Sequence, residues 1–316
     1  MTRRWACLAL VAWAAWGSSA TVGDVVHLVS KSNYIDLMDT QLFTHNGHDR
    51  RAGTGANHGQ ARDNIRSYLA GLSGVTASIV PWTYGSVSGE NVVGELRGVT
   101  NPEKVLIIGS HYDSVGNPGA DDNASGTAAV LEAARVLSHF RFDWTIRFIA
   151  FDCEELGLYG SRAYALNARN LGEDIVGMVS LDMVAYNGKG ANQAFLYGRD
   201  ASAPLKNAIK ASIEQYGNGI VATIKGSLDA SDHAPFEWQG YQACLLIEDY
   251  RNNPFYHTQQ DSFDSPGYLD FDYATNLTRA TVGWAASQAG LRAVPEPLSL
   301  AGLGLGLAVL ARRRRH

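Results

Sequence analysis

Three apolar segments of strand length each lead into side chains that can bind a metal ion, and this arrangement constrains the fold more than any other feature. The segments, with the side chains that follow them, are 104–109 with His111 and Asp113, 147–151 with Glu154 and Glu155, and 176–181 with Asp182. Helix-like segments separate them, which predicts parallel strands whose carboxyl ends meet at one edge of a sheet. Because ligands of open α/β sheets bind at that edge, we expect the functional site there.

The pattern along the chain predicts one α/β domain. Apolar residues make up 46% of the 316 residues, which is enough for a sizeable core. The expected helices are 25–43, 56–72, 128–140, 159–168, 203–216 and 269–291, and the expected strands are 75–80, 91–96, 105–109, 145–151, 176–183 and 241–247. Because strands and helices alternate from residue 105 onward, we predict a three-layer α/β/α sandwich around a mixed, mostly parallel sheet.

The first 20 residues have the composition of a secretory signal peptide. Two arginines precede an apolar run at residues 5–16, and small residues suit cleavage after Ala20. We therefore expect residues 1–20 to be removed during export, which leaves a domain at residues 21–293.

The C-terminal residues 294–316 combine three features in a fixed order: Pro295-Glu296-Pro297, an apolar run at 298–311 and four arginines at 312–315. As a helix the apolar run would rise about 21 Å, short of the roughly 30 Å hydrocarbon core of a bilayer. The segment resembles the Pro-Glu-Pro (PEP-CTERM) sorting signals of Gram-negative bacteria, which an exosortase-type enzyme recognises and removes. This resemblance implies transient membrane contact through the tail, and a final location in the cell envelope, at the cell surface or outside the cell.

The charge balance argues against nucleic acid as a partner. The six arginines near the two ends contribute +6 to a formal net charge of −5, so the rest of the chain carries −11.

Two cysteines, Cys153 and Cys244, lie outside the predicted signal peptide, and export would allow a disulfide between them. On parallel strands, however, the end of one strand and the start of the other would be offset by roughly 13 Å at about 3.3 Å per residue. A disulfide tolerates only about 7 Å between Cα atoms. We therefore predict two free buried thiols.

Six motifs follow one another along the chain: His-Tyr-Asp-Ser at 111–114, Ala-Asp-Asp-Asn-Ala-Ser-Gly at 120–126, Glu-Glu-Leu-Gly-Leu-Tyr-Gly-Ser at 154–161, Ser-Leu-Asp-Met at 180–183, Ser-Asp-His-Ala-Pro-Phe at 231–236 and Tyr-His-Thr at 256–258. Together they resemble the bacterial leucyl aminopeptidase family of secreted di-zinc exopeptidases, and the resemblance covers residues 51–290. It implies the zinc-dependent exopeptidase fold, which is phosphorylase/hydrolase-like.

The resemblance also implies two zinc ions. The metal ligands would be His111, Asp122, Glu155, Asp182 and His257. His111 and Asp182 would bind one ion, Glu155 and His257 the other, and Asp122 would bridge the two. Nitrogen and oxygen ligands of this kind suit zinc.

Asp122 is the expected bridge because it directly precedes Asn123, the position that the family uses, and Asp121 is the alternative. The resemblance further implies a cis peptide bond between Asp122 and Asn123.

Three more residues receive catalytic roles from the resemblance. Glu154 is the expected general base, because it neighbours a metal ligand and can reach water held between the ions. Asp113 lies on the same strand face as His111 and can accept its second imidazole N–H. Tyr256 either helps to hold a tetrahedral oxyanion or is a packed aromatic residue.

Several histidines and one aspartate have other expected roles. Asp232 is expected at a helix start, as an N-cap or as support for the metal ligands, without direct ligation by His233. His45, His48 and His58 lie in a polar, Gly-rich stretch, for which we favour a surface loop over metal binding.

We therefore predict a zinc-dependent aminopeptidase whose partner is a peptide substrate with a free N-terminus. A glutaminyl cyclase-type acyltransferase is the alternative within the fold. An amidohydrolase of the deacetylase type is disfavoured, because it spaces its first histidine and its bridging aspartate further apart than 111 and 122. A catalytically silent surface protein of the same fold would have lost ligands, whereas all five are present in the sequence.

Overall fold

The computed structural model of the protein describes residues 20–41 and 49–292. Within it, Thr21–Arg292 form a compact unit. The predicted signal peptide, apart from Ala20, and the predicted sorting tail lie outside the described residues. No helix in the described ranges is both long enough and apolar enough to cross a membrane.

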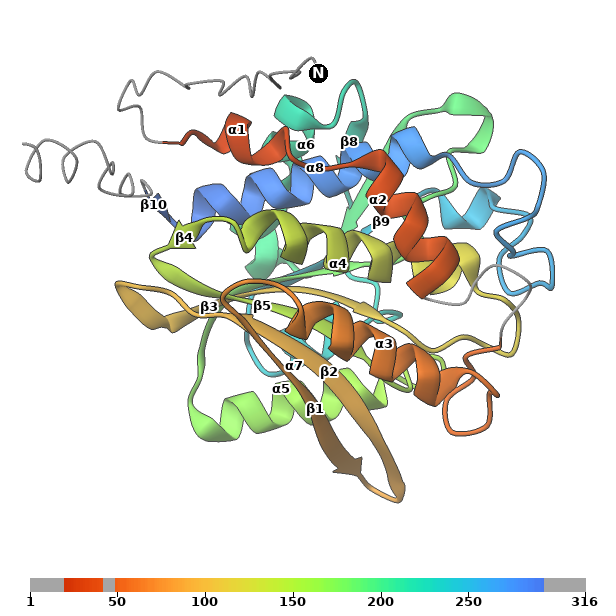
Figure 1. Cartoon of the computed structure of the whole chain (residues 1–316), viewed down its shortest axis with the longest axis horizontal. Coiled ribbons are helices and arrows are strands. Elements are labelled where there is room, and N and C mark those ends of the chain that lie inside the picture. The colour runs from red at the N-terminus through yellow and green to blue at the C-terminus, as the bar shows by residue number, and fades with distance from the viewer. Residues whose placement is uncertain (1–19, 42–48, 293–316) are drawn as a thin grey trace, which may run out of the picture. The chain divides into compact units, whose positions relative to one another are not determined.

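Eight strands of the described chain form one sheet, in the order β1-β2-β5-β3-β6-β9-β7-β8 (Figure 1). Their bounds are β1 (Val75–Tyr84), β2 (Val87–Leu96), β3 (Asn101–His111), β5 (Trp144–Phe151), β6 (Asp174–Leu181), β7 (Gln193–Tyr197), β8 (Val221–Ile224) and β9 (Ala243–Ile247). The four central strands β5, β3, β6 and β9 run parallel, so their carboxyl ends meet at one edge. Strand β2 is antiparallel to β5, and β7 is antiparallel to β9, which confirms the predicted mixed sheet. A separate two-stranded sheet pairs β4 (Arg141–Phe142) with β10 (Leu291–Arg292).

Helices cover both faces of the eight-stranded sheet, as predicted for three layers (Figure 1). The α-helices are α1 (Val22–Val26), α2 (Lys31–Asp36), α3 (His58–Ala70), α4 (Gly126–Leu137), α5 (Tyr159–Leu171), α6 (Ala203–Tyr216), α7 (His233–Trp238) and α8 (Phe271–Gln288). Helices α5 and α7 pack on one face, and the other helices pack on the opposite face. Each face of the sheet has its own apolar core, because successive side chains along β3 point to opposite faces. Leu106 and Ile108 face α4, whereas Val105 and Ile107 face α5 and α7.

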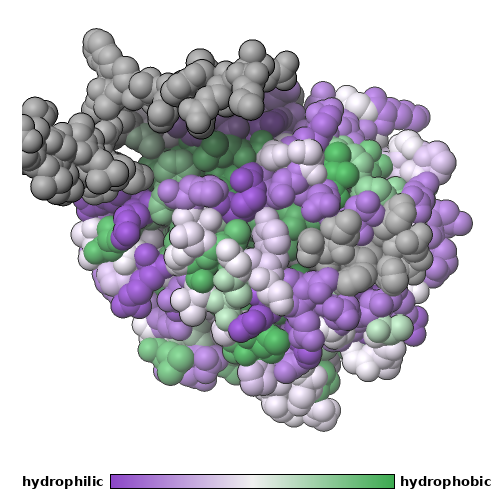
Figure 2. Space-filling view, in the orientation of Figure 1, coloured by the Kyte–Doolittle hydropathy of each residue, from purple (hydrophilic) through white to green (hydrophobic). Residues whose placement is uncertain are grey.

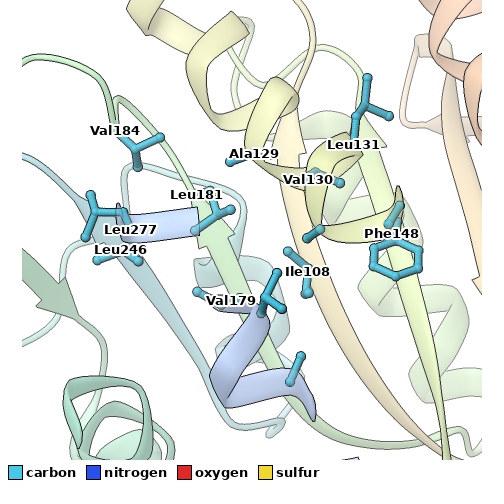
Figure 3. Close-up of a cluster of buried hydrophobic side chains, with 14 of the residues drawn as sticks. Ile108, Ala129, Val130, Leu131, Phe148, Val179, Leu181, Val184, Leu246 and Leu277 are labelled. Atoms are coloured by element: carbon cyan, nitrogen blue, oxygen red, sulfur yellow. The ribbon is translucent and has the colours of Figure 1, made fainter. Parts of the chain in front are cut away.

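The larger core lies between the sheet and α4 (Figure 3). Helix α4 consists mostly of alanine and aliphatic residues, and all of its side chains except that of Arg135 are buried. A helix that is apolar on nearly all sides is stable only when it is covered on both sides. Here the sheet covers one side of α4 and α8 covers the other. Polar residues dominate the outer surface on the face shown in Figure 2.

The prediction of one continuous N-terminal helix at 25–43 is wrong. The chain forms α1 and α2 instead, followed by a π-helical turn at Leu37–Gln41, and residues 42 and 43 lie outside the described ranges. Ser30 separates the two helices because its hydroxyl caps α2 by accepting the N–H of Asn33, while its own N–H donates to the buried carboxylate of Glu132. The apolar spacing therefore predicted helical structure correctly, but the cap that Ser30 provides for α2 was not predicted.

Strands β7 and β8 were not predicted from the sequence. Both strands are short and lie at the far side of the sheet, and β8 has an alternating exposed pattern. The helix start expected at Asp232 and His233 is confirmed by α7.

Candidate metal centre

The first group of metal-binding side chains contains His111, Asp122 and Asp182, which we call the His111 group. His111 is the last residue of β3, and Asp182 directly follows the neighbouring strand β6. The Nε2 atom of His111 lies 3.3 Å from Asp122 Oδ1 and 3.5 Å from Asp182 Oδ1. All three side chains are buried. Their ligand atoms lie within 4.8 Å of one another, close enough to hold one ion.

The second group contains Asp122, Glu155 and His257, which we call the His257 group. The Nε2 atom of His257 lies 3.1 Å from Asp122 Oδ2 and 3.5 Å from Glu155 Oε2. Asp122 therefore offers one carboxylate oxygen to each group. The His257 side chain is 41% exposed, whereas those of Asp122 and Glu155 are buried, so the second group faces solvent through His257.

The chemistry of these side chains fits bound cations. Three carboxylates with little exposed surface, those of Asp122, Glu155 and Asp182, lie close to the imidazoles of His111 and His257. Although Asp122 lies close to His111, the buried Nε2 of His111 and the buried Oε1 of Glu155 have no hydrogen-bond partner among the described residues. Buried polar atoms without partners are costly, and a metal ion coordinated by these nitrogen and oxygen atoms would satisfy them. The donor set suits zinc.

The loop that positions Asp122 is fixed by hydrogen bonds on two sides. The backbone N–H groups of Asp121 and Asp122 donate to the two carboxylate oxygens of Asp261, at 2.7 and 3.2 Å. On the other side, the amide of Asn123 donates to the carbonyl of Leu181 at 2.9 Å. The peptide bond between Asp122 and Asn123 is cis, as predicted.

Two further details of this loop agree with its sequence. Gly126 is required because a Cβ atom there would lie 2.2 Å from the carbonyl oxygen of Leu181. Asp121, the alternative bridge, is fully buried and accepts the N–H of Ala185 at 2.8 Å, and it belongs to neither ligand group.

Asp113 has a wider role than the sequence predicted. The Nδ1 atom of His111 lies 3.2 Å from the backbone carbonyl of Asp113, in hydrogen-bond geometry, and 3.4 Å from the Asp113 carboxylate. That carboxylate instead accepts the backbone N–H groups of Glu154 and Glu155, at 3.1 and 3.2 Å. Asp113 thus connects the end of β3 with the loop after β5.

The two adjacent glutamates are in an environment that disfavours their charged forms. Burial raises the pKa of Glu154 well above its usual range, and although the positive charge of His111 opposes this, Asp182 and Asp232 add to it. Burial and then the charge of Asp122 raise the pKa of Glu155 to about 8. A bound cation would reverse this effect for a ligating carboxylate.

Tyr256 lies at the open side of the centre. Its ring is 38% exposed, and its centroid is 3.9 Å from that of His257 and 6.1 Å from that of Tyr250. Burial, followed by the nearby carboxylates, raises the pKa of Tyr256, so its hydroxyl stays protonated and can donate a hydrogen bond.

Asp232 lies near the centre and does not cap a helix through its side chain. It occupies the N-cap position of α7, but its side chain makes no capping hydrogen bond. The carboxylate is fully buried near Asp182 and Glu154, and burial raises its pKa to about 7. His233 is also buried and belongs to neither ligand group.

His58 was wrongly expected in a surface loop. It begins helix α3, its side chain is only 15% exposed, and its Nε2 lies 2.8 Å from Asp152 Oδ1. The polar, Gly-rich sequence before α3 concealed this role, because the partner lies far away in the sequence. His45 and His48 lie outside the described residues.

Cys153 and Cys244 are free and buried, as predicted. The strand register confirms the expected offset, because Cys244 is level with Phe148 of β5, which lies before Cys153 in the chain, and the positions of the strands in the sheet add to this separation. Cys153 follows β5 and Cys244 lies in β9, and two other strands lie between these in the sheet. Three strand spacings of about 4.8 Å place them beyond the reach of a disulfide.

Comparison with known proteins finds one matching family and several similar proteins. Residues 91–282 match the family model described as Peptidase family M28. The chain is 33% identical to aminopeptidase YwaD of Bacillus subtilis over 203 residues, which cover 61% of this chain and 44% of YwaD. The chain thus spans about half the length of the curated relatives it matches.

Solved structures share the fold. The LapA aminopeptidase of Legionella pneumophila matches with a TM-score of 0.73 at 22% identity, over 89% of this chain and 78% of that one. BSAP, a zinc aminopeptidase from Bacillus subtilis, matches with a TM-score of 0.57 at 28% identity, over 66% of this chain and 52% of that one. A glutaminyl cyclase of Porphyromonas gingivalis matches with a TM-score of 0.68 at 20% identity, over 83% of this chain and 99% of that one.

Proposed function

Since the chain belongs to peptidase family M28, we propose that it is a zinc-dependent aminopeptidase, which removes N-terminal residues from peptides. The observation that supports this most strongly is the position of Asp122, which offers one oxygen to each of two ligand groups. Asp122 would contribute one oxygen to each of two ions, and the Glu154 carboxylate lies near His111 and Asp182 of the same site.

Five residues would hold the two ions. In this proposal His111 and Asp182 bind one ion, Glu155 and His257 bind the other, and Asp122 bridges them. When bound, the ions supply Lewis acidity, which makes a water molecule a nucleophile near neutral pH. The exposed side of His257 leaves a path for the substrate.

Glu154 moves the proton in this mechanism. Its carboxylate accepts a proton from the attacking water and later delivers it to the amine that leaves when the peptide C–N bond breaks. A glutamate whose pKa is raised by burial holds a proton more readily than an exposed one, which suits it to delivering that proton. The Tyr256 hydroxyl, kept protonated by its surroundings, donates a hydrogen bond to the oxyanion that develops on the carbonyl oxygen.

We further propose a preference for apolar N-terminal side chains. Met183, which directly follows the ligand Asp182, forms a small buried cluster with Leu245 and Ile247 of β9. Partly buried apolar and aromatic side chains pack on it: Phe195, Tyr197, Leu228 and Tyr250. Tyr250 contacts Tyr256 edge to face, so this apolar wall continues to the open side of the metal centre.

Hydrolysis of aminoacyl anilides tests the activity. We expect release from free-amine leucyl, methionyl and phenylalanyl substrates and none from N-acetylated ones. Cyclisation of N-terminal glutamine without anilide release would instead support the glutaminyl cyclase alternative. A purified protein that is folded and contains no zinc by elemental analysis would support a catalytically silent surface protein.

We also propose that the protein is exported and that both ends are removed. In support, Thr21 directly follows the expected cleavage site and begins the compact unit, where it caps α1 together with Asp24. An exosortase-type enzyme would remove the tail near Pro295-Glu296-Pro297. Intact-mass measurement of protein from its native host tests this, and a mature species that still contains residues 312–316 would contradict it.

A further inference from the structure

His58 contacts the ends of two neighbouring strands at once. Its Nε2 lies 2.8 Å from a carboxylate oxygen of Asp152, which follows β5. Its ring stacks on the ring of Tyr112, which follows β3, with centroids 5.1 Å apart and planes inclined by 19°. Because an ionised carboxylate can only accept, Nε2 is assigned as the protonated donor.

Both contacted residues are directly linked to the metal centre. Tyr112 lies between His111 and Asp113, and Asp152 precedes the Cys153-Glu154-Glu155 segment. A shift of either contacted residue would therefore move a metal ligand or the general base.

Several hydrogen bonds hold Asp152 in place, so its contact with His58 can help to position the residues that follow it. Its second carboxylate oxygen accepts the N–H of Glu90 at 2.9 Å, and its own N–H donates to the side chain of Asn91 at 3.0 Å. Its carbonyl accepts the N–H of Gly160 at 2.9 Å. These contacts come from β2 and α5, whereas His58 adds one from α3.

We propose that His58 is a positioning residue that fixes the loop of Glu154 and Glu155 relative to the end of β3. The inference rests on the proposed aminopeptidase function. Histidine suits this role because one side chain supplies both a flat ring for Tyr112 and an N–H for Asp152. Small displacements of reacting groups are costly in catalysis, and residues that orient metal ligands typically contribute about 10- to 100-fold in activity or metal affinity.

Two substitutions separate the two contacts. His58→Phe keeps a ring for Tyr112 but removes the hydrogen bond, whereas His58→Gln keeps an N–H that reaches Asp152. We expect His58→Phe to lower kcat by about 10- to 100-fold with KM changed by less than about threefold, and His58→Gln to recover most of kcat.

A third variant controls for stability. Leu69→Ala removes buried contacts from the same helix α3 without touching Asp152 or Tyr112. It should lower the melting temperature of the metal-free protein at least as much as His58→Phe does, but leave kcat within about twofold. If Leu69→Ala lowers kcat as much as His58→Phe, or if His58→Gln is as slow as His58→Phe, the proposal is overturned.

Zinc retention provides a readout that does not depend on turnover. After dialysis against a weak chelator, metal analysis should show faster zinc loss from His58→Phe than from the wild type or Leu69→Ala. A wild type that hydrolyses no peptide, together with this difference in zinc loss, would refute the proposed activity but support positioning. Equal zinc loss and equal kcat in His58→Phe and an active wild type would refute positioning alone.

Discussion

The Asp113 carboxylate accepts the backbone N–H of Glu154 at 3.1 Å, although 41 residues separate the two in sequence. The same carboxylate also accepts the N–H of Glu155 and lies 3.4 Å from the ring of His111. One side chain thus contacts a metal-binding histidine, the proposed general base and a ligand of the second group.

Asp113→Asn is expected to impair this connection without a large change in shape. The amide retains one acceptor oxygen but directs an N–H₂ group toward a backbone N–H. We expect kcat to fall by about 10- to 100-fold and zinc affinity to fall with it. Steady-state kinetics and zinc titration measure both effects, with Asp174→Asn at the exposed start of β6 as a matched control that should change neither.

Glu154→Gln is expected to retain both ions and lose turnover. The side chain keeps its size but can no longer accept and return a proton, so kcat should fall by at least about 100-fold. Elemental analysis and kinetics on the same preparation test this. A variant that loses zinc in proportion to its activity would identify Glu154 as a ligand instead.

Ligand substitutions should remove the ions selectively. His111→Ala or Asp182→Ala should lower the zinc content by one ion per chain, and His257→Ala should lower it by the other, because each residue belongs to one group. Asp122→Ala should reduce both, because Asp122 belongs to both groups. Metal analysis after gel filtration measures the zinc content, and a full complement in the Asp122 variant would contradict the bridging assignment.

His233 should make the metal-free protein sensitive to acid. Burial lowers the pKa of His233 to about 3, so the folded state keeps the ring neutral, whereas the unfolded chain binds a proton near pH 6.5. Its contribution to stability is thus complete above about pH 6.5 and is lost as the pH falls toward 3, at up to roughly 1.4 kcal/mol per pH unit. Urea unfolding of chelator-treated protein should show a shallower decline with pH for His233→Gln than for the wild type, and parallel curves would contradict this.

The fold and the edge of the sheet at which the site lies were predictable because both depend on local sequence. Apolar segments of strand length end in the side chains that meet at the sheet edge, and β3, β5 and β6 confirm this for His111, Glu155 and Asp182. The assignment of the ligands to two ions and the cis bond followed from the resemblance rather than from any local pattern.

The supporting contacts were not predictable in the same way. Asp261 holds the loop of Asp122 across 139 residues, and His58 holds Asp152 across 94. Each is a polar residue whose partner depends on how distant segments pack, which local periodicity does not reveal. The break at Ser30 was missed for a related reason, since its N–H pairs with Glu132 on another helix.

The spread of the ligands along the chain has a consequence for biogenesis. The His111 group is complete once residue 182 has been synthesised, but the His257 group also needs a loop that follows the ninth strand, near the end of the domain. A chain that folds from its N-terminus could therefore capture one ion early and the second only after nearly all of the sheet has formed. Binding of an ion to the His257 group would then indicate that folding is complete. A chain that ends before His257 could bind peptide or one metal ion, but it would lack the pair of ions that the proposed hydrolysis requires.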